Sequence, residues 1–430
     1  MAPRSPRGAH PRRSRRHARR GRRAACGDRT RHAHGSCGVD RRRTMSDAAN
    51  TASNTANNTA NDQRITAAAI AALPGIGPQR LRTLISSLGV HDAWRTLRGD
   101  LAPHGHIAAM LAHDHLGRSL RRHATDQLLE RTAAAIADHA MRVILRDDPE
   151  YPASLRGDFA APAVLFAIGD VSAFSKRRVG VVGTRAASAA GRHFARSMSR
   201  ELARSGVAVV SGLARGIDSA AHRGALDDED ESTAPPIAVV ASGLDIVYPR
   251  ENAGLWNAVA RRGVIVSESP PGCAPDAFRF PLRNRILAAV SELLVVVESR
   301  ESGGSMITVD EAAKRGITVM AVPGSPHSES SAGTNALIAD GATTVCHADD
   351  VLIALGLDHR RVSASSDARA RPSSADRVVL DALARAPATL EQLVAVLDLP
   401  VQEVALRLGH LEVQGWAVSN GGWWEALLAS

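Results

Sequence analysis

The 430-residue sequence is poor in aromatic residues, lysine and cysteine. Phe, Trp and Tyr make up 3% of the chain, and its two lysines, Lys176 and Lys314, do not follow glycine, which excludes a Gly-Lys-Ser/Thr phosphate loop. Four cysteines without a Cys-x-x-Cys pair fit neither a disulfide scaffold nor a zinc ribbon and favour a reducing, cytoplasmic location. No run approaches the roughly 20 apolar residues of a membrane helix, so we expect no membrane span.

The net charge of +9 is unevenly distributed. Residues 1–44 contain fifteen arginines and two aspartates, a net +13, so the rest of the chain carries −4. We interpret residues 1–62 as a disordered tail, because an Arg-rich run and a Thr-Ala-Asn repeat show no apolar periodicity. Met45 is an alternative start, and a misassigned start is favoured over a functional basic arm. Four possible zinc ligands of this tail have no recognised spacing, so no metal site is predicted: Cys26, His32, His34 and Cys37.

Residues 63–140 are rich in Ala and Leu and predict a helical domain. Within it, Leu73-Pro-Gly-Ile-Gly-Pro78 precedes an amphipathic run over residues 79–88. This pattern is typical of a helix-hairpin-helix, whose glycine turn can direct backbone N–H groups at a phosphate. A plain helical connector fits the six residues equally well.

Residues 141–358 alternate short apolar runs with helical segments. The predicted strands are residues 142–146, 164–168, 178–182, 207–210, 237–241, 264–266, 293–298, 318–322 and 343–346. Continuous apolar strands separated by helices predict an α/β fold, namely a doubly wound, mostly parallel Rossmann-like sheet.

The polar residues 359–375 predict a linker, and residues 376–430 predict a further domain. Its pattern is three helices, over residues 376–384, 390–397 and 401–414, followed by a hairpin around Ser-Asn-Gly-Gly. This order of elements predicts a winged helix.

Ligands of open α/β sheets gather at the carboxyl ends of the strands. The first such loop is Gly183-Thr184-Arg185, whose hydroxyl, amides and guanidinium suit a phosphate, although a Gly-x-Gly-x-x-Gly fingerprint is absent. A later loop before a helix predicts a second anion site: Gly303, Gly304 and Ser305.

The loop after residues 207–210 supplies four more candidates: Ser211, Gly212, Arg215 and Gly216. Its glycines allow close approach of the backbone to a ligand. Asp218 is predicted to be a helix N-cap and His222 a packed histidine, a reading preferred over an acid–base pair because no nucleophile is evident.

A local cluster of cations and aromatics follows residue 277. The candidate contacts in it are Arg279, Phe280, Arg283, Asn284 and Arg285, with Phe278 as a further stacking face. In a body of net charge −4, this cluster favours a groove that binds a nucleic-acid strand. The alternative is a solvated helix face.

These motifs, in one unbroken order over residues 151–355, resemble the DNA-processing protein A family (DprA/Smf). They are Gly183-Thr-Arg185, Ser211-Gly-Leu-Ala-Arg-Gly-Ile-Asp218, Ala241-Ser-Gly-Leu-Asp245, Tyr248-Pro249, Glu268-Ser-Pro-Pro-Gly272, Phe280-Pro-Leu-Arg-Asn-Arg285, and Val322-Pro-Gly324 with Gly333-Thr-Asn335. The resemblance implies a non-enzymatic mediator, without cofactor, that binds and protects single-stranded DNA in natural transformation and loads the RecA recombinase. It also implies a homodimer formed through the Rossmann-like domain, and DNA contacts by Gly183–Arg185 and Arg283–Arg285.

Two other functions are disfavoured. Nucleotide phosphoribohydrolases of similar fold carry a Gly-Gly-x-Gly-Thr loop and a following Glu. Asp310 and Glu311 could stand for that Glu, but Ser305 and Met306 break the loop pattern. A sequence-specific regulator would need a more basic recognition helix than residues 401–414.

Overall fold

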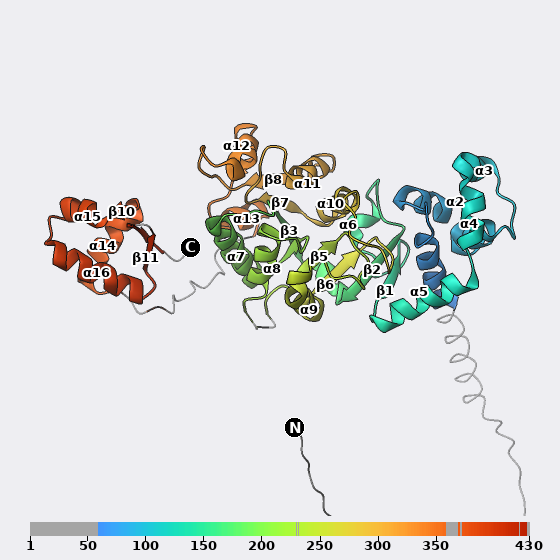
Figure 1. Ribbon diagram of the computed structural model, residues 1–430, viewed down its shortest axis with the longest axis horizontal. Coiled ribbons are helices and arrows are strands. Elements are labelled where there is room, and N and C mark those ends of the chain that lie inside the picture. Colours follow the sequence, from blue (N-terminus) through green and yellow to red (C-terminus); the bar gives the residue numbers. More distant parts are fainter. Residues whose placement is uncertain are drawn as a thin grey trace, which may run out of the picture. The chain divides into compact units, whose positions relative to one another are not determined.

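The computed structural model describes residues 59–228, 230, 232–357, 369, 372–420 and 422–427. These residues form N-terminal helices, a nine-stranded sheet covered by helices, and a C-terminal group of three helices with a small sheet (Figure 1). Residues 1–58, including Met45 and the four possible zinc ligands, lie outside this description, as does most of the predicted linker. No helix within the described ranges is long and apolar enough to cross a membrane.

The N-terminal region is helical from residue 59, four residues before the predicted start of this domain. The helix of residues 59–71 is followed by α2 (Pro78–Arg98), α3 (Gly105–Ala112), η1 (His113–His115), α4 (Leu116–His123) and α5 (Asp126–Asp138). Pro78 occupies the first position of α2, where its missing N–H costs no hydrogen bond. Gly99 ends α2 with a φ of 94°, a conformation that glycine adopts without strain.

All nine predicted strands are present, with ends that differ from the prediction by at most two residues. They are β1 (Arg142–Leu145), β2 (Val164–Gly169), β3 (Arg177–Val182), β4 (Val207–Ser211), β5 (Ile237–Val240), β6 (Val264–Ser267), β7 (Leu293–Val296), β8 (Thr318–Ala321) and β9 (Thr343–Thr344). Their order is β1-β2-β6-β5-β4-β3-β7-β8-β9. Strand β2 pairs antiparallel with β1 and β6, and the remaining pairs are parallel.

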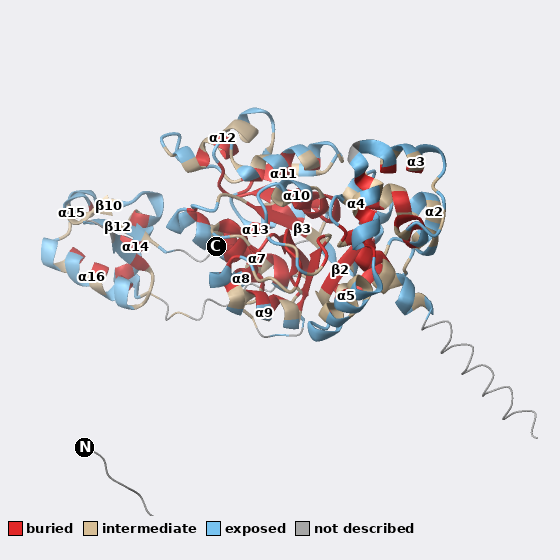
Figure 2. Ribbon diagram, turned by 45° about the vertical axis from the view of Figure 1, so that its right-hand side comes forward, coloured by how far each residue is buried: buried red, intermediate tan, exposed pale blue. Residues whose placement is uncertain are grey.

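Helices cover both faces of the sheet, which explains why its strands are apolar throughout (Figure 2). In β3, Val179 and Val181 pack with α7 and α8, whereas Val182 belongs to the core on the side of α10. The helices of this region are α6 (Ala153–Arg156), η2 (Val171–Ser175), α7 (Ala189–Arg204), α8 (Ile217–Ala225), η3 (Arg250–Asn252), α9 (Ala253–Arg262), α10 (Arg279–Val290), α11 (Gly304–Ala313), η4 (Glu329–Ser331), α12 (Ala332–Ala339) and α13 (Ala348–Ala354).

The strand order reverses between β3 and β7. From β3 the chain builds β4, β5 and β6 on one side, and it then crosses back to add β7, β8 and β9 on the other. The carboxyl ends of β3 and β7 are therefore neighbours from which the two connections leave in opposite directions. Such a switch point leaves a ligand crevice at that edge of the sheet.

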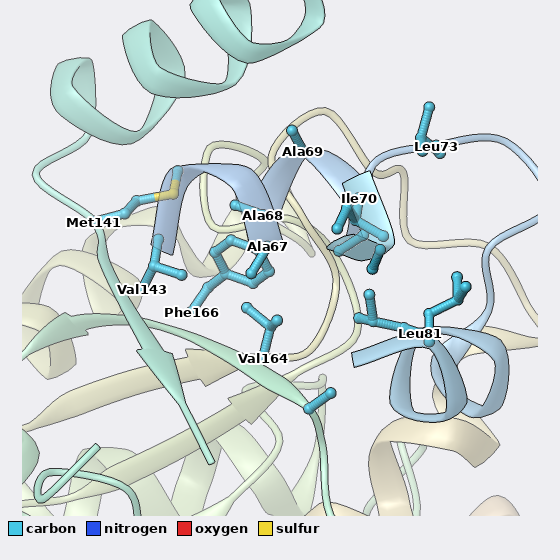
Figure 3. Packing of buried hydrophobic residues seen from close by; sticks show 14 of the residues in the cluster. Ala67, Ala68, Ala69, Ile70, Leu73, Leu81, Met141, Val143, Val164 and Phe166 are labelled. Atoms are coloured by element: carbon cyan, nitrogen blue, oxygen red, sulfur yellow. The ribbon is translucent and has the colours of Figure 1, made fainter. Parts of the chain in front are cut away.

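The helix of residues 59–71 packs on the β1–β2 edge of the sheet (Figure 3). Ala67 and Ile70 share one hydrophobic core with Val164 and Phe166 of β2. A bidentate ion pair between Arg64 and Asp148, with both N···O distances 3.1 Å, adds a polar contact beside this core. The turn that follows this helix is thus held beside the α/β domain.

The C-terminal region is a winged helix, as predicted. It comprises α14 (Ser374–Arg385), β10 (Ala388–Thr389), α15 (Leu390–Leu397), α16 (Val401–Val413), β11 (Ala417–Asn420) and β12 (Trp423–Ala426). Thr389 and Gln392 form a capping box at the start of α15. On α16, Arg407 pairs with Glu403 and donates to the Ala375 carbonyl at 2.6 Å, so its charge is used within the domain.

Candidate functional site

A hollow of about 650 Å³ lies at the carboxyl ends of β3 and β7, where the strand order reverses. We call it the groove. It brings together nine of the predicted site residues: Gly183, Thr184, Arg185, Phe280, Arg283, Asn284, Gly303, Gly304 and Ser305. Residues from three segments that are distant in sequence, the loop after β3, the start of α10 and the start of α11, thus meet at the edge where the fold places ligands.

The Gly183–Arg185 loop is fixed by backbone hydrogen bonds. The Thr184 N–H donates to the Glu298 carbonyl at 2.7 Å, and the Thr184 carbonyl accepts from Ile217 at 3.3 Å. A Cβ on Gly183 would come within 2.8 Å of the Glu298 carbonyl, so only glycine fits beside β7. This rigid loop presents the exposed Arg185 side chain to the groove.

Arg185 contacts one ring of an aromatic pair. Its guanidinium carbon is 4.6 Å from the centre of the Phe280 ring, a cation–π contact. Tyr248, which is 38% exposed, has its ring centre 5.8 Å from that of Phe280. The groove therefore combines a cation with ring faces, the two features that hold phosphates and unpaired bases.

Arg283 forms part of the groove wall but is only 7% exposed. Its Nη1 donates to the Val239 carbonyl at 2.6 Å. Burial lowers the pKa of Arg283, and the carboxylate of Asp218 opposes that shift. The guanidinium of Arg283 thus lies in the domain interior, bonded to a backbone carbonyl. Its contact with a DNA phosphate stays a prediction.

Asp218 is not the N-cap of α8, so that prediction is wrong. The N-cap is Gly216 at a φ of 75°, where a Cβ would lie 2.2 Å from the Thr184 carbonyl. Asp218 instead lies in the first turn, and its Oδ2 accepts from the Gly212 N–H at 3.1 Å. Burial raises the pKa of Asp218, while Arg283 opposes the rise. The carboxylate therefore holds the preceding loop rather than the helix end.

His222 is completely buried in α8. Burial lowers its pKa from 6.5 to about 4. The imidazole is therefore neutral at pH 7 and packed in the core, which agrees with the preferred reading of the sequence.

The remaining predicted site residues do not line the groove: Ser211, Gly212, Arg215, Gly216, Arg279 and Arg285. Ser211 is buried and donates to the Val181 carbonyl at 2.7 Å. Arg215 is exposed and pairs with Glu251. The Arg285 side chain is 12% exposed, pairs with Glu268 and donates to the Ala160 carbonyl at 2.5 Å. Ion pairs thus occupy several of the cations that the sequence marked as phosphate ligands.

The loop before α11 closes the groove on the side of β7. Gly303 is the N-cap of α11, and the Ser305 hydroxyl donates to the Ser299 hydroxyl at 2.7 Å. The Asn284 side-chain amide donates to the Gly304 carbonyl at 3.3 Å, which ties α10 to this loop.

Sequence reasoning missed Arg300 as a groove residue. Its side chain is 65% exposed, and its contact with Glu329 is long, at 3.4 Å. The available signal was its position just after β7, at the switch point. Within the ranges that the structure describes, no cluster of His, Cys, Asp or Glu could hold a metal ion.

Comparison with known proteins identifies the family. The family model for DNA recombination-mediator protein A matches residues 142–356, which contain the whole groove. The chain belongs to this DprA/Smf family. A second model, the DprA winged helix domain, matches residues 364–422. The resemblance inferred from the motifs is confirmed.

Members of the family with known names or structures are similar over much of the chain. A putative DNA processing protein DprA of Mycobacterium tuberculosis is 39% identical over 308 residues, which are 67% of this chain and 77% of the relative. DNA processing protein DprA of Bacillus subtilis is 38% identical over 224 residues, 52% of this chain and 74% of the relative. The crystal structure of DprA from Streptococcus pneumoniae matches with a TM-score of 0.56 and 30% identity, and the match covers 66% of this chain and 95% of that one.

Proposed function

We propose that the protein binds single-stranded DNA in the groove. The observation that carries this proposal is the contact of the exposed Arg185 with Phe280, with Tyr248 beside it. An arginine fork suits a phosphate, and ring faces suit any unpaired base, so the combination favours a single strand of any sequence. In a duplex the bases are stacked on one another and offer no face to these rings.

We further propose that the protein acts as a binding mediator and not as an enzyme. Among the described residues that line the groove, Asp218 is the one carboxylate, and it is buried and bonded to the Gly212 N–H. Glu311, the acid that a phosphoribohydrolase reading would use, does not line the groove and pairs with Lys314 and Arg315. The groove therefore offers contacts for a strand but no free acid for hydrolysis.

The biological role in this proposal is the protection of incoming DNA in transformation and the loading of the RecA recombinase, by a homodimer formed through the Rossmann-like domain. Its support is family membership, since the family is named for mediating DNA recombination.

The loading step can be tested by following RecA filament assembly on oligonucleotides coated with single-strand-binding protein. Filament assembly that is no faster with this protein present would contradict the loading role. Light scattering tests the dimer.

Fluorescence anisotropy with matched single- and double-stranded oligonucleotides, with and without ATP, tests the binding itself. We expect at least about tenfold tighter binding of the single strand, or roughly 1.4 kcal/mol, and no need for ATP. Equal affinity for both would contradict the stacking argument. Release of free base from nucleoside monophosphates would instead establish the enzyme reading.

A further inference from the structure

A second concave surface lies on the other side of the start of α10. Two adjoining hollows of about 450 and about 470 Å³ separate the N-terminal turn of residues 72–78 from α10. They share four lining residues, Gly77, Pro78, Arg80 and Leu282, so they form one continuous space, which we call the crevice.

The crevice is rich in positive charge. Five arginines line it: Arg80, Arg82, Arg279, Arg283 and Arg285. Among the described residues that line either hollow, Glu268 is the one carboxylate, and it is paired with Arg285. Arg279 also pairs with Asp276, and Arg283 is buried near Asp218, whereas Arg80 and Arg82 donate to the backbone carbonyls of Gly75 and Phe159. These last two leave an excess of positive charge in the crevice, which suits a polyanion.

An exposed aromatic ring accompanies these cations. Phe278 lines the crevice and is 61% exposed, and the guanidinium carbon of Arg279 lies 5.0 Å from its ring centre. The pair repeats the arrangement of Arg185 and Phe280 in the groove. The two phenylalanines thus face two different spaces from the same end of α10.

Arg283 connects the two spaces, because it lines both the groove and the crevice. Its Nε is buried without a hydrogen-bond partner among the described residues. On the opposite wall, Arg80 Nη1 donates to the Gly75 carbonyl at 2.8 Å, which holds this guanidinium at the N-terminal turn. A Cβ on Gly77 would meet no atom within 4 Å, so the turn itself leaves the space open.

We propose that the crevice is a second contact for the same DNA strand. The strand leaves the groove past the start of α10, its phosphates pass Arg80 of the N-terminal turn, and a base stacks on Phe278. The proposal rests on the function proposed above and extends it, because it gives the N-terminal helical region a part in binding. It also predicts that only strands longer than the groove use this contact.

Oligothymidylates of two lengths, about 6 and about 20 nucleotides, separate the two surfaces. For the longer strand, we expect Arg80→Ala to lower affinity about tenfold and to make the slope of log K against log salt shallower by about 0.7. Phe278→Ala should lower the affinity for the longer strand without changing that slope. Neither change should alter binding of the shorter strand. Arg95→Ala, on α2 but outside the crevice lining, is the matched control and should change neither.

The outcomes also distinguish this inference from the proposed function. If the unaltered protein binds neither oligonucleotide, single-strand binding itself is wrong, and the crevice contact with it. If it binds both, and Arg80→Ala and Phe278→Ala leave the longer strand unaffected, the groove is the whole site and the crevice proposal is overturned. If the two variants lose affinity equally for the short and the long strand, the proposal is also overturned, because the residues would then affect the groove only by stabilising the fold. A lower unfolding temperature in the same variants would identify that cause.

Discussion

The guanidinium of Arg283 packs directly on the backbone of Gly212. A Cβ added to Gly212 would lie 1.7 Å from Arg283 Nη1, so with arginine at position 283 only glycine fits at position 212. The Gly212 N–H in turn donates to Asp218, the acidic neighbour of this arginine. This wall of the groove is therefore held by close contacts in the domain interior, through Gly212, Asp218 and Arg283.

Gly212→Ala should displace Arg283 and destabilise the fold by about 1–3 kcal/mol, the usual result of overpacking a core. Affinity for single-stranded DNA should fall with it, because Arg283 lines the groove. Urea unfolding and anisotropy on the same variant measure both effects. Gly254→Ala in α9 is the matched control, since its Cβ would meet nothing within 4 Å. An unchanged free energy of unfolding in Gly212→Ala would contradict the packing described here.

Arg283→Met should destabilise the fold by about 1–3 kcal/mol at pH 7, because the Val239 carbonyl loses its donor and the buried Asp218 loses the nearby positive charge that opposes the rise of its pKa. Combining Arg283→Met with Asp218→Leu should restore much of that loss, since no unpaired charge remains. A double-mutant cycle by urea denaturation measures the coupling. Additive losses would show that the two side chains do not act as a pair.

Phe280→Leu should weaken single-strand binding by about 1–3 kcal/mol for each base stacked on the ring. The loss should be the same at low and high salt, because stacking releases no counterions. Tyr248→Phe keeps its ring and serves as the control, with unchanged affinity expected. A loss for Phe280→Leu that disappears at high salt would mean that the ring acts only by orienting Arg185.

His222 should make the fold sensitive to acid. As the pH falls below about 6.5, the unfolded chain takes up a proton at this imidazole, whereas the folded chain does so only near pH 4. This one group should therefore remove up to about 3 kcal/mol of stability between pH 7 and pH 4. The free energy of unfolding of His222→Gln should fall less over that pH interval. As a control, His193→Gln, at an exposed position of α7, should show the same fall as the unaltered protein. Equal falls in the unaltered protein and His222→Gln would contradict the buried neutral imidazole.

The sequence was sufficient to predict the sheet, because strands buried on both faces are continuous apolar runs such as residues 207–210. It also predicted the groove loops, since the carboxyl ends of such strands meet at one edge. It could not predict that Arg283 is buried and that Arg285 is largely covered and paired. The carboxylates near them, Asp218 at the start of α8 and Glu268 after β6, come from other parts of the chain. A run of arginines at the start of a helix does not indicate which side chain points inward.

Arg185 tests the central claim most directly, because it is exposed at the groove and contacts Phe280. We expect Arg185→Ala to weaken binding of single-stranded DNA of every sequence and to make the slope of log K against log salt shallower by about 0.7, with an unchanged unfolding temperature. That result would identify Arg185 as a phosphate contact. An unchanged salt slope, with or without a lower unfolding temperature, would contradict the claim that this groove binds the DNA backbone.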